Sequence, residues 1–180
     1  MKNSLIVAPL ALLAVGLAST AHAQSGNITF NGEVTSVTCE VSFNGVVGND
    51  ATVTLPTVAA SSLPQGASAG RTPVQVHVGG NDPICSSGAV TIALNPDHDA
   101  QLLDGRLMNQ ALAAPGTNVV VGLRDAQDQP IDLSAGWLAP VAGTNAAGTD
   151  ITFHAEYYAQ GGDAVPGMFQ APVQYTLIYP

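Results

Sequence analysis

Short runs of alternating apolar and polar residues, separated by Gly, Pro, Asn and Asp, make up most of this chain beyond its first two dozen residues. Alternation with a period of two places successive side chains on opposite faces of a β-strand. Repeated at this spacing, it predicts an all-β fold, either an antiparallel sandwich or a barrel. The runs lie at residues 27–34, 38–43, 51–55, 74–78, 90–94, 118–124, 151–157 and 173–179. Only residues 101–112 offer room for a short helical turn.

Residues 1–23 have the layout of a secretory signal peptide. Lys2 supplies a positive charge, residues 5–17 form an apolar run, and Ala21 and Ala23 occupy the small-residue positions before a cleavage site. The alternative is a membrane anchor, but crossing a bilayer needs about 20 apolar residues and this run is shorter. We therefore expect cleavage after Ala23 and export of the remaining chain.

The exported chain, residues 24–180, is acidic and carries little positive charge. Loss of Lys2 removes its only lysine, so three arginines stand against 13 acidic residues and the formal charge is 3 − 13, or −10. Nucleic acids and anionic membranes attract basic patches, so we expect no nucleic-acid partner. No later segment is long and apolar enough to span a bilayer, so we expect no direct membrane insertion. The length fits a single domain.

Two cysteines remain, Cys39 and Cys85. In an exported chain an even number of cysteines predicts a disulfide. Closing a loop of this length contributes about 4 kcal/mol on chain-entropy arithmetic. The alternative is a pair of metal ligands, but the C-x-x-C or Cys/His spacing of a zinc site is absent. We expect a Cys39–Cys85 disulfide.

Few side chains suggest catalysis. His77 and His154 lie on the polar side of alternating runs, where surface histidines are expected, and Trp137 suits a core or edge position. Residues 97–99, Asp-His-Asp, resemble a metal-ligand cluster, but they follow Asn-Pro in a loop where solvated residues are expected. The G-x-S-x-G elbow of serine hydrolases is absent. We therefore expect no enzyme, no metal and no cofactor.

Four segments, taken in order, carry a family resemblance. They are GNITFNGEV at 26–34 with Cys39 after it, TNVVVGLRD at 117–125, ITFHAEYYA at 151–159, and the final run 173–180 with Tyr179 penultimate. In these segments the chain resembles the chaperone–usher pilins, in particular type 1 fimbrial subunits. The resemblance covers most of the exported chain and is weakest at 97–114.

The resemblance implies an immunoglobulin-like sandwich that lacks its final strand and is completed by a donor strand from a neighbouring subunit. Residues 24–35 would be the donor extension and 36–180 the pilin domain. The inserted face would consist of Ile28, Phe30, Gly32 and Val34. The strand that borders the empty groove and contacts the chaperone would carry Val173, Tyr175, Leu177 and Tyr179. Pro180 departs from the pattern, because proline has no N–H to donate there.

The partners implied are identical or related pilin subunits, a periplasmic chaperone and an outer-membrane usher, and the location is a surface fimbria that supports adhesion. We favour a repeated shaft subunit, and a short adaptor subunit stays open. A two-domain tip adhesin would need a further lectin domain. Two other classes remain as alternatives: a self-contained secreted sandwich that binds carbohydrate, and a secreted hydrolase.

Overall fold

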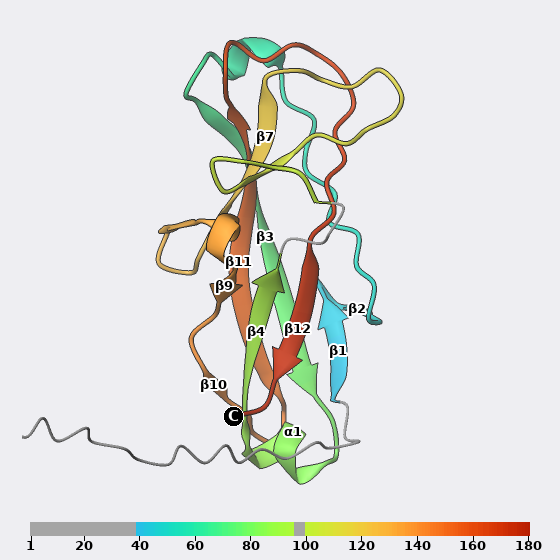
Figure 1. The fold of residues 1–180 in the computed structure, drawn as a ribbon. Helices are drawn as coiled ribbons and strands as arrows, with labels where there is room; N and C mark the ends of the chain where they lie inside the picture. Colours follow the sequence, from blue (N-terminus) through green and yellow to red (C-terminus); the bar gives the residue numbers. More distant parts are fainter. Residues whose placement is uncertain (1–38, 96–99) are drawn as a thin grey trace, which may run out of the picture. The chain divides into compact units, whose positions relative to one another are not determined.

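The computed structural model describes residues 39–95 and 100–180 of a compact unit that spans Ser36–Pro180. The expected signal peptide, the expected donor strand and the 97–99 cluster lie outside the described residues. All strand pairs within the described part are antiparallel. The predicted all-β fold is therefore confirmed (Figure 1).

The larger sheet has β3 and β11 at its centre, and these two long strands share the longest pairing in the molecule. Its order is β2 (Val46–Val47), β1 (Glu40–Phe43), β3 (Ser68–Gly79), β11 (Thr149–Ala159), β7 (Val119–Arg124), β6 (Arg106–Met108) and β5 (Leu102–Leu103), with β8 (Pro130–Ile131) also paired to β7.

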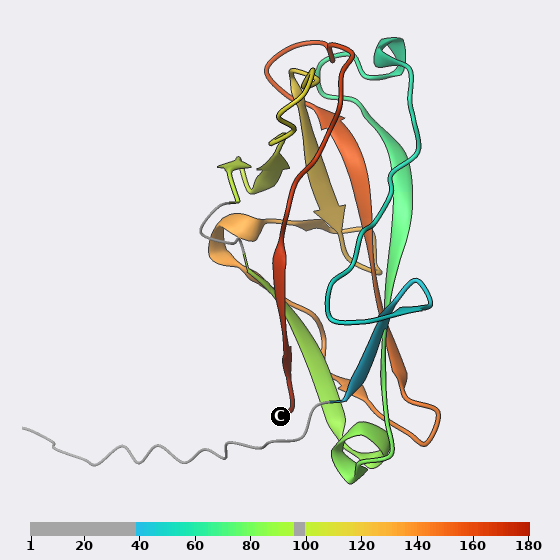
Figure 2. The ribbon, with the colours of Figure 1, turned by 90° about the vertical axis from the view of Figure 1, so that its right-hand side faces the viewer.

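The smaller sheet is built around β4 (Ala89–Asn95). β12 (Gln174–Ile178) pairs with one edge of β4, and the short strands β9 (Trp137–Leu138) and β10 (Ala142–Gly143) also pair with β4. Figure 2 shows the two sheets as separate layers, with β4 and β12 in one and β3 and β11 in the other. The fold is therefore a sandwich rather than a barrel.

The core lies between these layers and follows from the alternation in the sequence. Val74, Val76 and Val78 of β3 point inward and are at most 3% exposed. From the other sheet, β4 contributes side chains that include Ile92 and Leu94, each at most 1% exposed. Full burial of such a side chain contributes about 1.5–3 kcal/mol, so these two strands hold the layers together.

One short helix interrupts the strands and was not expected from the sequence. α1 (Pro83–Ser87) begins where Asp82 caps it, since the Asp82 carboxylate accepts a hydrogen bond from Ile84 N at 3.0 Å. Proline at the first helical position suits this start, because its φ is already helical and no N–H is lost there. The helix carries Cys85 and so positions the disulfide. Two single-turn 3₁₀ segments also occur, at Ala60–Ser62 and Leu133–Ala135.

Two expectations about local structure are wrong. Residues 101–112 form no helical turn but the hairpin of β5 and β6, whose turn residues Asp104 and Gly105 have φ values of 48° and 73°. Asp-Gly favours such a turn, because both central residues must adopt positive φ. Residues 51–55 were expected to be a strand, yet they have no strand partner among the described residues.

Candidate functional site

β12 lies at the edge of the smaller sheet and its second edge has no described partner. It pairs with β4 from Gln174 opposite Asn95 to Ile178 opposite Thr91, and no other described strand pairs with it. Backbone N–H and C=O groups of a strand alternate in direction, so about half of those in β12 point away from β4. An edge of this kind can pair with a further strand.

The inner face of β12 is apolar but only partly covered. Ala171, Val173, Tyr175, Leu177 and Tyr179 are half-buried and pack against the core, whereas the residues between them are exposed. Fully covered core residues elsewhere in the sandwich are at most 8% exposed. The structure therefore leaves apolar surface on this face that one more layer of side chains could cover.

Residues 51–58 run beside β12 and also have half-buried apolar side chains between exposed ones. Val53, Leu55 and Val58 are half-buried while most of their neighbours are exposed, and the first two pack against the core. No backbone hydrogen bond joins 51–58 to another described residue. In Figure 2 this cyan stretch runs between β12 and β3, and Figure 1 also shows it near β12. We call 51–58 and 171–179 together the open edge.

Tyr175 connects β12 to β1 and to the loop that follows β2. The Tyr175 ring meets the Phe43 ring of β1 edge-on, with centroids 5.0 Å apart. Its hydroxyl donates to the Asn49 carbonyl at 2.7 Å. Burial raises the pKa of Tyr175, and the nearby Asp50 carboxylate and Tyr179 raise it further. The phenol therefore remains protonated and able to donate at physiological pH.

At the far end of β12, the chain is tied to the disulfide. The expected Cys39–Cys85 bond is present, with the two Cα atoms 5.6 Å apart. Cys39 N also donates a long hydrogen bond of 3.4 Å to the Tyr179 hydroxyl. The C-terminus lies near α1 in Figure 1. We call this region, with Cys39, α1 and the C-terminus, the disulfide end.

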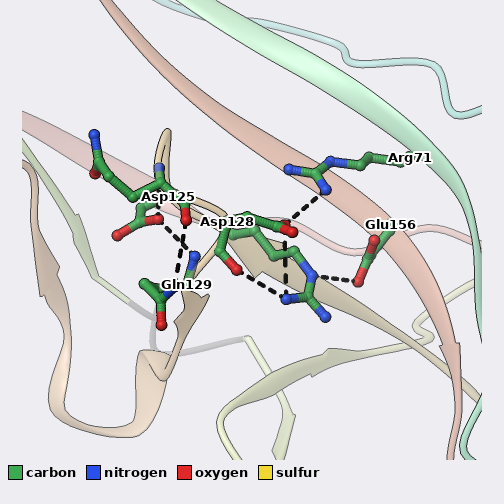
Figure 3. A network of polar contacts seen from close by, with 7 residues as sticks. Arg71, Asp125, Asp128, Gln129 and Glu156 are labelled. Carbon is green, nitrogen blue, oxygen red and sulfur yellow. Dashed lines mark hydrogen bonds and ion pairs between the residues drawn. The ribbon is translucent and has the colours of Figure 1, made fainter.

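A charged cluster lies on the larger sheet (Figure 3) and has a structural role. Arg124 donates through Nε to the Glu156 carboxylate at 2.7 Å and through Nη1 to the Asp128 carbonyl at 3.0 Å. Arg71 of β3 pairs with the Asp128 carboxylate at 2.6 Å. Hydrogen bonding to Glu156 raises the pKa of Arg124. The cluster thus ties the β7–β8 turn to β3 and β11.

The remaining polar residues do not assemble a catalytic or metal site in the described ranges. No group of three or more His, Cys, Asp or Glu side chains there could hold a metal ion. His77 pairs with Asp150 at 2.8 Å and is partly exposed. Trp137 is partly buried and packs edge-on against Phe153, in keeping with the core or edge position expected of it. No helix of the described part could cross a membrane, since none is long and apolar enough.

Four residues of the last strand were expected to border the groove, and the structure places them together. Val173, Tyr175, Leu177 and Tyr179 share the inner face of β12 and its flanks. Sequence reasoning missed residues 51–58 as the opposite side. Alternation predicted a strand at 51–55, but nothing in that pattern distinguishes a paired strand from an unpaired one. Ile28, Phe30, Gly32 and Val34 lie outside the described residues.

Comparison with known proteins agrees with this architecture. The family model described as "Fimbrial protein" matches residues 28–180. The chain is 40% identical to the major fimbrial subunit SMF-1 of Stenotrophomonas maltophilia (strain K279a), over 88% of this chain and 95% of that protein. It is 34% identical to the F17 fimbrial protein of Escherichia coli, over 94% and 96%.

Solved structures agree on the fold. A chaperone–usher pilus structure, described for the uncoiling of its rod, superposes with a TM-score of 0.58 at 17% identity, covering 91% of this chain and all of that one. With the two antiparallel sheets, this likeness confirms the predicted immunoglobulin-like pilin sandwich. The family match and the curated relatives go further than the fold. This chain belongs to the fimbrial protein family and is a structural subunit of surface fimbriae, not an enzyme.

Proposed function

We propose that this chain is a repeated shaft subunit that polymerises by donor-strand exchange, with residues 24–35 of one copy entering the open edge of the next. One observation carries the proposal. Two strand-like sides, 51–58 and β12, border the same half-covered apolar face, and neither is hydrogen-bonded on the side toward the other among the described residues. A single added strand would pair with β12 and cover that face.

The proposed donor has a matching pattern. Ile28, Phe30 and Val34 alternate with polar residues, so an extended strand presents them on one face. Burying three such side chains contributes roughly 5–9 kcal/mol, at about 1.5–3 kcal/mol each. Each backbone hydrogen bond to β12 adds about 0.5–1.5 kcal/mol. Strand addition of this kind takes its strength from main-chain bonds and its selectivity from alternate side chains.

The same open edge implies an assembly factor. An exposed, apolar strand edge is an aggregation hazard before it is paired. We therefore propose that a periplasmic chaperone covers β12 after export and that an outer-membrane usher replaces it with the next subunit. The curated relative named as a major fimbrial subunit supports a main shaft role over an adaptor role. Signal cleavage after Ala23 is part of the same proposal.

Deletion of residues 24–34 tests the proposal. Chains that lack them should fold, form the Cys39–Cys85 disulfide and bind the chaperone, but electron microscopy of the producing cells should show no fibres. Gly32→Leu should act in the same way, because a strand glycine often marks close backbone approach. Asn31→Leu is the matched control, since it adds the same side chain on the opposite face of the strand, and its fibres should form.

The proposal is wrong if chains without 24–34 still assemble into fibres. It is also wrong if the wild-type chain purifies alone as a stable monomer with no exposed apolar edge. That second outcome would favour the self-contained binding sandwich instead.

A further inference from the structure

Two hydrogen-bonded segments, residues 110–117 and 164–168, form a flap at the end of the sandwich where β12 begins. Met168 N donates to Ala114 O at 2.8 Å, and Met168 O accepts from Gly116 N at 2.9 Å. In Figure 1 these loops lie at the top, while α1 and the C-terminus lie at the bottom. The flap and the disulfide end are therefore opposite ends of the described domain.

The flap exposes large apolar side chains. Leu112 is fully exposed, Met168 is 63% exposed and Val165 is 48% exposed. The flap itself contains no Asp, Glu, Lys or Arg. The charge nearest to it in sequence is Asp163, whose carboxylate accepts a hydrogen bond from Gln65 N at 2.9 Å. Clustered exposed apolar groups mark interaction sites more often than isolated ones do.

The position of the neighbouring subunit indicates what covers this flap. Every described strand pair is antiparallel, and a donor that continues this pattern runs opposite to β12. The last apolar residue of the proposed donor, Val34, would then lie beside the start of β12, next to the flap. Only residues 35–38 separate Val34 from Cys39, so the donating copy begins its folded domain within at most about 18 Å.

The disulfide end of that donating copy therefore comes to the flap of the accepting copy. This end carries three carboxylates, Glu40 after Cys39, Asp82 at the start of α1, and Asp150 near the end of β3. Like charges placed across an interface cost several kcal/mol. An uncharged flap in a chain with 13 acidic residues avoids this repulsion.

We propose that the flap packs against the disulfide end of the adjacent copy of this chain, as a second subunit contact separate from the donor strand. The inference rests on the proposed donor-strand function, because that function places the two ends together. The donor strand holds copies together, and the flap limits how far one copy bends relative to the next.

A lysine placed on the flap tests this contact. The exported chain has no lysine, so Leu112→Lys introduces a single side-chain amine. In assembled fibres treated with a zero-length carbodiimide, peptide mass mapping should find position 112 coupled to Glu40, Asp82 or Asp150 of another copy. Leu138→Lys is the control: Leu138 is 56% exposed but belongs to β9, so position 138 should not couple to these acids.

Fibres of the Leu112→Lys chain in which position 112 couples to none of the three acids overturn the flap contact. If that chain does not assemble, Val165→Lys places the amine on the other half of the flap, and the same couplings decide the question. Failure of the donor-strand proposal gives a different result, since fibres would then persist without residues 24–34.

Bending gives an independent measurement. Met168→Asp adds a charge to the flap without changing the donor strand or β12. Fibres should form in normal amount and resist detergent, but their persistence length in electron micrographs should fall at least twofold. An unchanged persistence length would mean that the flap does not contact the next copy.

Discussion

The disulfide joins the start of the first described strand to the short helix that follows β3, so it fixes the point where the folded domain begins. Breaking it with Cys39→Ser and Cys85→Ser together should destabilise the subunit by about 2–5 kcal/mol, as for small secreted domains. Denaturant unfolding of the exported chain measures this loss. Equal midpoints for the double variant and the wild type would contradict it.

Tyr175 makes subunit stability depend on alkaline pH. Its pKa is raised above the ordinary value of 10.0 in the folded chain, chiefly by burial. Stability from this group is therefore complete below pH 10 and is lost as the pH rises through the raised pKa. The phenolate also cannot donate to the Asn49 carbonyl.

We expect Tyr175→Phe to reduce the drop in melting temperature of the exported chain between pH 8 and pH 11. Ile178→Ala on the exposed face of the same strand is the control, because it changes no titratable group. An unchanged drop in Tyr175→Phe would exclude this tyrosine as the source of the pH dependence.

At the scale of elements, β11 contains a bulge in its pairing with β3. The register with β3 shifts between Ala155 and Tyr157, so Ala155 and Glu156 are both buried although they are adjacent. A bulge turns one side chain out of the alternation. Here it places the Glu156 carboxylate against Arg124 of β7, and the pair satisfies a charge that would otherwise be costly to bury.

The Arg124–Glu156 pair should therefore matter more than the other ion pairs. A double-mutant cycle with Arg124→Ala and Glu156→Ala should give a coupling energy within about 0.5–3 kcal/mol. The matched cycle with Arg71→Ala and Asp128→Ala should give less than about 1 kcal/mol, because both side chains are exposed. Urea unfolding of the exported chain measures both, and equal couplings would refute the distinction.

β12 is predicted to be indispensable to capture by the proposed periplasmic chaperone. Removing residues 173–180 takes away the half-buried side chains of the strand and its hydrogen-bonding edge. The truncated chain should leave β4 unpaired on that side and be degraded in the periplasm. Quantitative blotting of periplasmic extracts measures the effect, and a soluble, folded truncated monomer would disprove the role of this strand.

The strands that the sequence located best are those with uninterrupted alternation. β11 reaches two residues beyond the expected 151–157 at each end. β4 reaches one residue beyond the expected 90–94 at each end. β3 begins well before the expected 74–78, because Gly70 and Pro73 interrupt the pattern and tertiary pairing with β11 overrides them.

Which edge stays open could not be predicted from alternation alone. Residues 51–55 show the same alternation as a paired strand, and the absence of a partner is a property of the whole fold. Two features could have been predicted from the sequence and were missed. Asp-Gly at 104–105 favours the hairpin turn, and Asp-Pro at 82–83 favours the start of α1. The donor residues rest on family resemblance, and their role stays a prediction.

For the whole molecule, the proposed function means that the sandwich is completed by a strand from outside the acceptor domain. That sequence can in principle come from the same chain. β12 ends at Ile178, two residues before the C-terminus. Appending an Asn-Gly turn and a copy of residues 24–35 after Pro180, with the native 24–35 removed, would return a strand antiparallel to β12.

This rearranged chain should be a stable monomer that forms no fibres. Three buried apolar side chains contribute at least about 5 kcal/mol. At about 2–4 °C for each kcal/mol in a domain of this size, the melting temperature should rise by about 10 °C or more over the chain lacking 24–35. The same rearranged chain with Gly32→Leu in the appended copy should show little of this rise, because the larger side chain keeps the appended strand from inserting beside β12. Calorimetry and light scattering measure the two properties together. A rearranged chain that still polymerises, or that melts no higher than the chain lacking 24–35, would show that an antiparallel donor beside β12 does not complete the fold.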